Sequence, residues 1–256
     1  MSYIDRDGIS IYFESEGEGP ALLLSHGYSS TGAMWNAQVE ALRDTHHVIT
    51  WDMRGHGRSD YPAAPEAYSE RLTVEDMAAI LDVCEVERAT IGGLSLGGYM
   101  SLAFHHAFPE RTAALLLFDT GPGYKSDDGR DEWNRTSIGR AERLESEGLA
   151  ALNRSREVKA RNHRSALGLA GAARGMLAQA DDRIIQSLPG IDVPTLVVVG
   201  ADDTPFLGAS SYMAHKISGA HQVIIPDAGH ASNLDQPAAF NATVEEFLAG
   251  LAAPVR

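Results

Sequence analysis

The chain has 256 residues, 44% hydrophobic and 22% charged, which suits one globular domain with a sizeable core. Its formal net charge of −14 argues against nucleic acid and anionic membranes as partners. The single cysteine, Cys84, leaves no intrachain disulfide, and no apolar run is long enough for a signal peptide or a membrane span. We therefore expect a cytoplasmic protein.

The first half of the chain predicts strands that alternate with helices. Residues 2–15 alternate around Asp7-Gly8, which predicts an antiparallel hairpin. The segments that follow are expected, in chain order, as a strand at 21–25, a helix at 34–42, a strand at 48–52, a loop at 52–60, a helix at 72–83 capped by Thr73, a strand leading into Ser95, a helix at 96–108 and a buried strand at 113–118.

The second half resumes this pattern after an interruption. Between Pro122 and Pro189 the strand pattern vanishes, and helices are expected near 138–153 and 166–180. A strand at 194–200, a helix at 207–217, a strand at 222–226 and a helix at 237–251 complete the chain. The alternation predicts an α/β fold, with a mainly parallel doubly wound sheet and an N-terminal antiparallel hairpin. We expect residues 1–121 and 190–256 to form the core, and residues 122–189 to form a helical cap.

The segment Gly93-Leu-Ser95-Leu-Gly97 lies where a predicted strand passes directly into a helix. Glycines two residues before and after Ser95 let the backbone fold closely past itself, so the hydroxyl would project at the carboxyl edge of the sheet. Such a turn, a nucleophile elbow, presents a serine for covalent catalysis. Because this short motif arises by chance roughly once in five chains of this composition, its meaning depends on the residues around it.

A serine nucleophile needs a base, and the base needs an orienting acid. His230 follows the predicted strand at 222–226 and is the candidate base, because reactive groups gather at the carboxyl ends of parallel strands. Asp203 follows the strand at 194–200 and is the candidate acid, with Asp202 and Asp119 as alternatives.

The remaining histidines are interpreted as structural or exposed. His56 lies in the glycine-punctuated loop and is assigned a structural role. The adjacent pairs at 46–47 and 105–106 are expected at the surface, because neighbouring side chains cannot share one face, and His163, His215 and His221 lie in polar contexts. No pair has the H-E-x-x-H spacing of a zinc site, so we expect neither a metal nor another cofactor.

Acyl transfer also needs hydrogen-bond donors for the developing oxyanion. Two backbone amides are candidates: that of Leu96, directly after Ser95, and that of Tyr28, in the loop that follows His26-Gly27. Gly27 would let this loop approach the substrate closely.

Together these segments resemble the α/β-hydrolase superfamily along essentially the whole chain. The resemblance is carried by His26-Gly27, the loop at 52–60, Gly93–Gly97, the strand and acid at 194–203, and Gly229-His230, with nucleophile, acid and base in the order Ser, Asp, His. In this superfamily the loop at 52–60 looks like a structural turn, so its charged residues are not assigned to catalysis.

Within the superfamily, the length and the cap are similar to small carboxylesterases and 3-oxoadipate enol-lactone hydrolases. The segment Trp133-Asn-Arg135, followed by Glu147-Gly-Leu149, resembles the start of the lactonase cap. This resemblance implies that Trp133 and Arg135 bind substrate.

The charge of the expected cap differs from that of the rest of the chain. Residues 122–189 carry 12 lysines and arginines against 10 aspartates and glutamates, whereas the remaining residues carry 9 against 25. A cationic lid over an acidic body would attract an anionic substrate. The alternative is that the basic segment at 154–164 is simply a solvated helical face.

The predicted reaction is hydrolysis of a small-molecule carboxylic ester or lactone through an acyl-enzyme on Ser95, with self-association into a homodimer left open. Three alternatives use the same fold. They are a cofactor-free perhydrolase or haloperoxidase, a C–C bond hydrolase, for which the apolar neighbours Leu94 and Leu96 are poorly suited, and a ligand receptor with little turnover.

Overall fold

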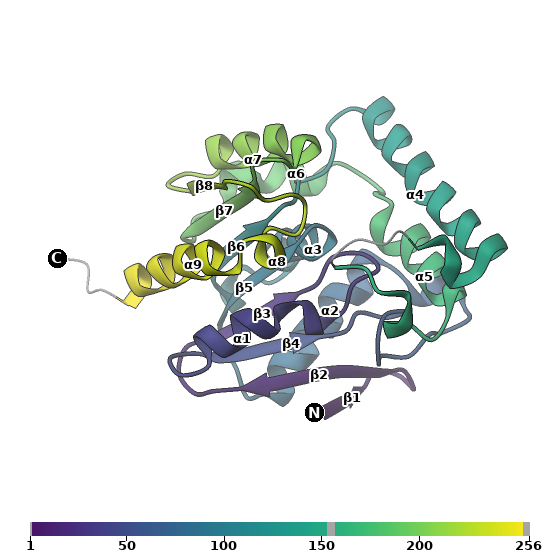
Figure 1. Ribbon diagram of the computed structural model, residues 1–256, viewed down its shortest axis with the longest axis horizontal. Coiled ribbons are helices and arrows are strands. Elements are labelled where there is room, and N and C mark those ends of the chain that lie inside the picture. Colours follow the sequence, from purple (N-terminus) through teal and green to yellow (C-terminus); the bar gives the residue numbers. More distant parts are fainter. Residues whose placement is uncertain (1, 153–156, 253–256) are drawn as a thin grey trace.

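The computed structural model describes residues 2–152 and 157–252. These residues form an eight-stranded sheet at the centre of the fold, with helices packed around it (Figure 1). In chain order the strands are β1 (Ser2–Asp5), β2 (Ser10–Glu16), β3 (Ala21–Ser25), β4 (His47–Trp51), β5 (Ala89–Leu94), β6 (Thr112–Phe118), β7 (Thr195–Gly200) and β8 (His221–Ile225). Their order across the sheet is β1-β2-β4-β3-β5-β6-β7-β8. The β1–β2 and β2–β4 pairs are antiparallel and the others are parallel, which confirms the predicted fold class.

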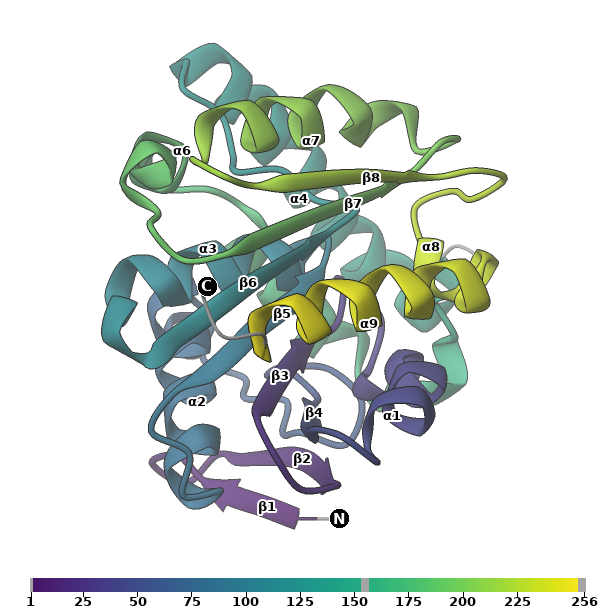
Figure 2. The same cartoon turned by 90° about the vertical axis from the view of Figure 1, so that its left-hand side faces the viewer.

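Helices cover both faces of the sheet, as the turned view in Figure 2 shows. They are α1 (Asn36–Leu42), α2 (Glu70–Val83), α3 (Leu96–Ala107), α4 (Asp127–Glu147), α5 (Ala166–Ala172), α6 (Arg183–Ser187), α7 (Thr204–Lys216), α8 (Ser232–Asp235) and α9 (Pro237–Ala252). Helices α1 and α9 pack on one face, and α2, α3 and α7 pack on the other. Within the two described ranges, no helix combines the length and the apolar character needed to cross a membrane.

The central strands β3, β5, β6 and β7 are buried because they supply side chains to two cores at once. In β3, Leu22 and Leu24 belong to the core under α1 and α9, whereas Leu23 belongs to the core under α2 and α3. Alternate side chains of a strand point to opposite faces, so a continuous apolar run is what a sheet covered on both faces requires.

The segment between β6 and β7 carries α4, α5 and α6, and no strand occurs among its described residues. A small apolar cluster joins α4 to α5 through Ala141, Leu144, Leu169 and Ala170, and Tyr28 packs against it. In Figure 1, α4 and α5 stand at the opposite side of the molecule from the C-terminal end of α9. We call residues 122–189 the inserted segment below.

The helices of the inserted segment differ in extent from the prediction. The helix expected near 138–153 begins at Asp127, capped by Ser126, and ends before Gly148, whose φ is 65°. Asn153 lies outside the described residues. The helix expected at 166–180 is divided into α5 and a π turn at Ala173–Leu177.

Two further expectations are wrong. The cap of α2 is Ser69, whose hydroxyl accepts a hydrogen bond from the Leu72 amide at 3.1 Å, because the helix begins one turn before Thr73. His105 is buried near the end of α3, because α3 packs against the sheet and against α2 and α6, and only its neighbour His106 is exposed.

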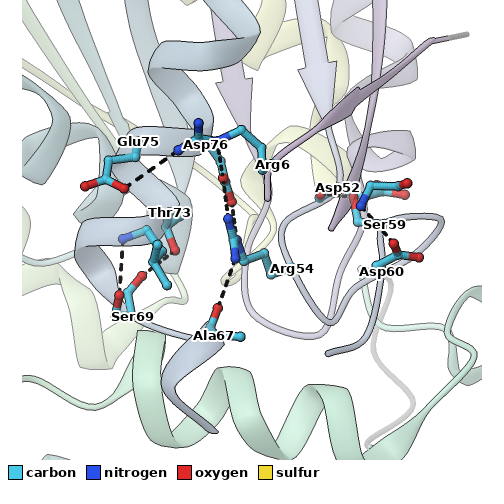
Figure 3. A network of polar contacts seen from close by, with 12 residues as sticks. Arg6, Asp52, Arg54, Ser59, Asp60, Ala67, Ser69, Thr73, Glu75 and Asp76 are labelled. Atoms are coloured by element: carbon cyan, nitrogen blue, oxygen red, sulfur yellow. Dashed lines mark hydrogen bonds and ion pairs between the residues drawn. The ribbon is translucent and has the colours of Figure 1, made fainter. Parts of the chain in front are cut away.

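A buried ion pair anchors the loop that follows β4 (Figure 3). The Arg54 guanidinium donates to both carboxylate oxygens of Asp76 on α2, at 2.6 and 2.8 Å, and both side chains are almost fully buried. Arg6 donates to the same carboxylate at 3.2 Å, and Arg54 also reaches the Ala67 carbonyl. Arg54 is therefore engaged in holding the loop on α2.

We predict that Asp76→Ala lowers the free energy of unfolding by about 3–5 kcal/mol, because it leaves the buried Arg54 guanidinium without its carboxylate. Asp82→Ala is the matched control. Asp82 lies on the same helix and pairs with Arg111, but its side chain is 64% exposed, so its loss costs less than about 1 kcal/mol. Urea denaturation of both variants measures the difference, and equal losses would contradict this assignment.

Candidate active site

Ser95 occupies a strained turn between β5 and α3. Its φ is 56° and its ψ is −115°, a conformation that side-chain-bearing residues adopt rarely and at a cost of about 1–3 kcal/mol. Two hydrogen bonds hold the turn: the Ser95 amide donates to the Phe118 carbonyl at 2.9 Å, and the Thr120 hydroxyl donates to the Ser95 carbonyl at 2.7 Å. The turn has the form of the nucleophile elbow that the sequence predicted.

The glycines beside Ser95 permit this turn by close backbone contact. A Cβ at Gly93 would lie 2.4 Å from the Gly97 carbonyl carbon, and a Cβ at Gly97 would lie 2.2 Å from the Ser25 carbonyl oxygen. No side chain fits at either position, so β3, β5 and α3 meet at van der Waals distance around the serine.

His230 and Asp203 lie at the ends of two other strands and are bonded to each other. His230 is in the loop between β8 and α8, and Asp203 is in the turn between β7 and α7. Their side chains are joined by a 2.9 Å hydrogen bond from His230 Nδ1 to Asp203 Oδ2. The Phe206 ring stacks on the imidazole, with the ring centroids 4.9 Å apart. With Nδ1 engaged, Nε2 is the nitrogen left for a reacting group.

The electrostatics of this pair favour a basic imidazole. Burial opposes the charged form, but the hydrogen bond and the negative charge of Asp203 outweigh it, so the pKa of His230 is raised above its ordinary value of 6.5. An imidazole of raised pKa accepts a proton more readily than a free one.

The two alternative acids lie in other surroundings. Asp202 is exposed. Asp119 is buried, and its carboxylate accepts hydrogen bonds from the Gly200 amide at 2.8 Å and from the Ser232 hydroxyl. Burial raises the pKa of Asp119 to about 7, although these hydrogen bonds act to lower it. Asp119 therefore joins β6, β7 and α8, and Asp203 is the carboxylate that contacts the His230 ring.

The two amides proposed as oxyanion donors lie beside Ser95. Leu96 begins α3 directly after it, and a Cβ at Gly27, next to Tyr28, would lie 3.5 Å from the Ser95 Cβ. Within the described ranges neither the Tyr28 nor the Leu96 amide donates a hydrogen bond to another protein group. Both N–H groups are thus available to a ligand oxygen.

Ser95, His230 and Asp203 line one cavity of about 480 Å³. Its walls also include Tyr28 from the loop after β3, residues of α7, and side chains of the inserted segment. Among the latter are Trp133, Arg140, Arg143, Leu144 and Glu157. We call this space the histidine chamber.

A second cavity of about 320 Å³ meets the first at Ser95. The two share Ser95, Trp133, Leu177, Pro205 and Phe206, but the second does not reach His230. Its other walls are formed by uncharged residues: Leu96, Tyr99, Thr120, Gly121, Pro122, Gly123, Tyr124, Gln179 and Ala209. We call this space the uncharged chamber.

The sequence matches the family described as the alpha/beta hydrolase family over residues 22–243. The chain belongs to this family. The resemblance drawn from the motifs is thereby confirmed.

Three similar proteins illustrate the range of this hydrolase family. 3-oxoadipate enol-lactonase 1 from Acinetobacter baylyi is 30% identical over 91% of this chain and 90% of its own length. A putative 2-succinyl-6-hydroxy-2,4-cyclohexadiene-1-carboxylate synthase from Bacillus subtilis is 28% identical over 96% of this chain and 97% of its own. Among solved structures, a thermophilic esterase from Thermogutta terrifontis, described as malate-bound, has a TM-score of 0.87 at 29% identity, covering 99% of this chain and all of its own.

The structure separates the two residues that the lactonase-like motif singled out. Trp133 lies at the junction of both chambers, where its indole N–H donates to the Leu177 carbonyl at 2.8 Å. Arg135 is exposed and lines neither chamber. Among the described residues, the arginines that line the histidine chamber are Arg140 and Arg143, which share a face of α4 because three residues are almost one helical turn.

Sequence reasoning also missed His163. Its side chain is only 6% exposed, rather than solvated, and it lies beside His56, with ring centroids 5.8 Å apart. His56 in turn lies beside His26 at 4.9 Å. Across residues 2–152 and 157–252, no three His, Cys, Asp or Glu side chains are placed to hold a metal ion together.

We predict that Gly97→Ala destabilises the protein by about 1–3 kcal/mol, because the added methyl group meets backbone atoms that cannot move aside. Gly208→Ala is the control. Gly208 lies inside α7 with open space around the added methyl group, so alanine there stabilises the helix by about 0.5–1 kcal/mol. Urea denaturation measures both effects. Destabilisation of similar size in the two variants would contradict the close contact at Gly97.

Proposed function

We propose that this protein is a serine hydrolase that cleaves a carboxylic ester or lactone. Ser95 is the nucleophile, His230 the base and Asp203 the acid that orients the imidazole. The observation that carries the proposal is the 2.9 Å bond between His230 and Asp203 in the cavity that also contains the strained Ser95. Family membership and the named esterase and enol-lactonase among similar proteins support the same chemistry.

In the first half-reaction, Ser95 Oγ attacks the carbonyl carbon while His230 Nε2 takes the hydroxyl proton. The carbonyl oxygen becomes an oxyanion that accepts hydrogen bonds from the Tyr28 and Leu96 amides. The C–O bond to the leaving group then breaks, and the imidazolium returns the proton to the leaving oxygen. Asp203 stabilises the imidazolium throughout, which agrees with the raised pKa of His230.

In the second half-reaction, water attacks the acyl carbon of the Ser95 ester as His230 takes one of its protons. The tetrahedral intermediate collapses, the bond between Ser95 Oγ and the acyl carbon breaks, and His230 returns the proton to Ser95. The carboxylic acid leaves. In these steps the protein supplies side chains and backbone amides, and water is the second substrate.

The two chambers suggest which part of an ester lies where. His230 must protonate the leaving oxygen, so the leaving group occupies the histidine chamber. The acyl group must leave that space free for the attacking water, so it occupies the uncharged chamber beside Leu96 and Tyr99. In a lactone both parts belong to one molecule that bridges the chambers.

The charges of the histidine chamber favour a leaving group that carries an anion. Arg140 and Arg143 of α4 line this space, and Arg143 also pairs with Glu147 at 3.5 Å. Among the described residues of the walls, the carboxylates are Asp203, which is bonded to His230, and Glu157. A carboxylate on the leaving-group side would therefore find two guanidinium groups able to donate charge-assisted hydrogen bonds to it. The role first assigned to Arg135 passes in this proposal to Arg140 and Arg143.

We predict that Ser95→Ala lowers kcat for p-nitrophenyl butyrate by about 10⁴–10⁶-fold and abolishes labelling by a fluorophosphonate probe, because no nucleophile remains. Ser210→Ala is the matched control, since Ser210 is also a buried serine and its hydroxyl has no partner within the described residues. It retains both turnover and labelling. Labelling of the parent protein without turnover would instead indicate a ligand receptor.

We predict that Arg140→Gln lowers kcat/KM for 4-(butyryloxy)benzoate by about 10-fold, the loss expected for a charge-assisted hydrogen bond, and changes that for phenyl butyrate by less than twofold. Arg135→Gln is the control on the same helix and affects neither substrate. Glu157→Gln raises the preference for the charged ester. An equal effect of Arg140→Gln on both esters would contradict the anionic leaving group.

A further inference from the structure

The amide and the carbonyl of Ser29 are each hydrogen-bonded to a histidine side chain. The Ser29 amide donates to His56 Nε2 at 3.1 Å, and the Ser29 carbonyl accepts from His163 Nε2 at 2.8 Å. Ser29 directly follows Tyr28, whose amide is a proposed oxyanion donor. Its φ of 57° is in the left-handed region, which a serine adopts only when its surroundings hold it there.

His163 is built into this contact through both ring nitrogens. Its Nδ1 accepts from the Gly57 amide at 3.3 Å, which leaves the ring proton on Nε2 and directs it at the Ser29 carbonyl. Burial is the main cause that lowers the pKa of His163, and the neighbouring His26 lowers it further. The bond to Ser29 and the charge of Asp52 act in the opposite direction but do not outweigh burial. The imidazole is therefore neutral near pH 7 and keeps this pattern of one donor and one acceptor.

Two further bonds connect the same loop to the inserted segment. The Tyr28 hydroxyl donates to the Leu169 carbonyl at 2.9 Å, and the Ser30 hydroxyl donates to the Glu157 carbonyl at 3.0 Å. Three consecutive residues, 28 to 30, are thus each bonded to the inserted segment. Of these bonds, the one from His163 is the only one that holds the main chain of the loop, since the other two use side-chain hydroxyls.

We infer that His163 is a positioning residue that fixes the Tyr28 amide for oxyanion binding, an inference that rests on the proposed function. Without the bond to its carbonyl, Ser29 keeps only the bond from its amide to His56 and the turn bond from the Ser30 amide to the Gly27 carbonyl at 3.0 Å. Its positive φ is then less tightly held, and the adjoining Tyr28 amide loses part of its fixed orientation. An oxyanion donor acts on the transition state more than on the bound ester, so the loss falls on kcat rather than on KM. The inserted segment thereby contributes to catalysis as well as to the walls of the chambers.

Two polar substitutions separate the bond to Ser29 from the rest of the environment of His163. His163→Gln places an amide N–H near the position of Nε2 and keeps a donor to Ser29. His163→Asn reproduces only the Nδ1 side, toward Gly57, and loses that donor. His105→Asn is the matched control, because His105 is equally buried, at 6% exposed, but lies at the far end of α3.

We predict that His163→Asn lowers kcat for phenyl butyrate by about 10–100-fold with KM within twofold, while His163→Gln stays within about threefold of the parent protein. The inhibition constant of a trifluoromethyl ketone, which forms an oxyanion on Ser95, rises by the same factor in His163→Asn. That of the corresponding secondary alcohol, which forms none, does not change. Titration with a fluorophosphonate corrects each rate for the fraction of folded enzyme.

Equal kcat values for His163→Asn and His163→Gln, or equal weakening of the ketone and the alcohol, would overturn the inference. If His163→Asn does not fold, His163→Gln decides, with His105→Asn as its control. The inference is supported if kcat and the ratio of ketone to alcohol affinity both stay within about threefold of the parent protein, or if both fall by the same factor. It is overturned if one of the two falls and the other does not. Failure of the proposed function is seen separately, as turnover that persists in Ser95→Ala.

Discussion

The backbone contact among β3, β5 and α3 is the constraint on which the site depends. Because Gly93 and Gly97 have no side chain, α3 begins against the carbonyl of Ser25, and Ser95 is forced to a φ of 56°. This strain is offset by the surrounding sheet, in which every residue of β5 is buried. The parallel order of β5, β6, β7 and β8 then brings the loops that carry Asp203 and His230 to the same edge of the sheet.

The sequence predicted the residues whose role follows from their place at a strand end. Ser95, Asp203 and His230 each stand just past an apolar run, and that position is visible in the order of residues alone. The inserted segment was less predictable, because α4 is polar along most of its length and its inward face is short. Arg140 and Arg143 were therefore missed, whereas Arg135 was chosen on a motif. The burial of His163 depends on contacts with residues more than 100 positions away, which no local pattern records.

The core and the inserted segment divide the proposed reaction between them. The core supplies Ser95, the His230–Asp203 pair and the amide of Leu96. The inserted segment supplies Trp133 and the two arginines, and it holds the loop that carries Tyr28. Such a division explains how one triad serves different substrates within a family, because helices that are not part of the sheet can change without disturbing the elbow.

The proposed reaction passes through an acyl group carried by Ser95, and finding that group on the protein would establish it. The enzyme is mixed with p-nitrophenyl butyrate, quenched in acid during turnover, digested and mapped by mass spectrometry. We predict a butyryl group on the peptide that contains Ser95, formed at a rate no slower than turnover. Steady release of butyrate with the acyl group on another residue, or with none detectable under conditions in which deacylation limits the rate, would contradict it.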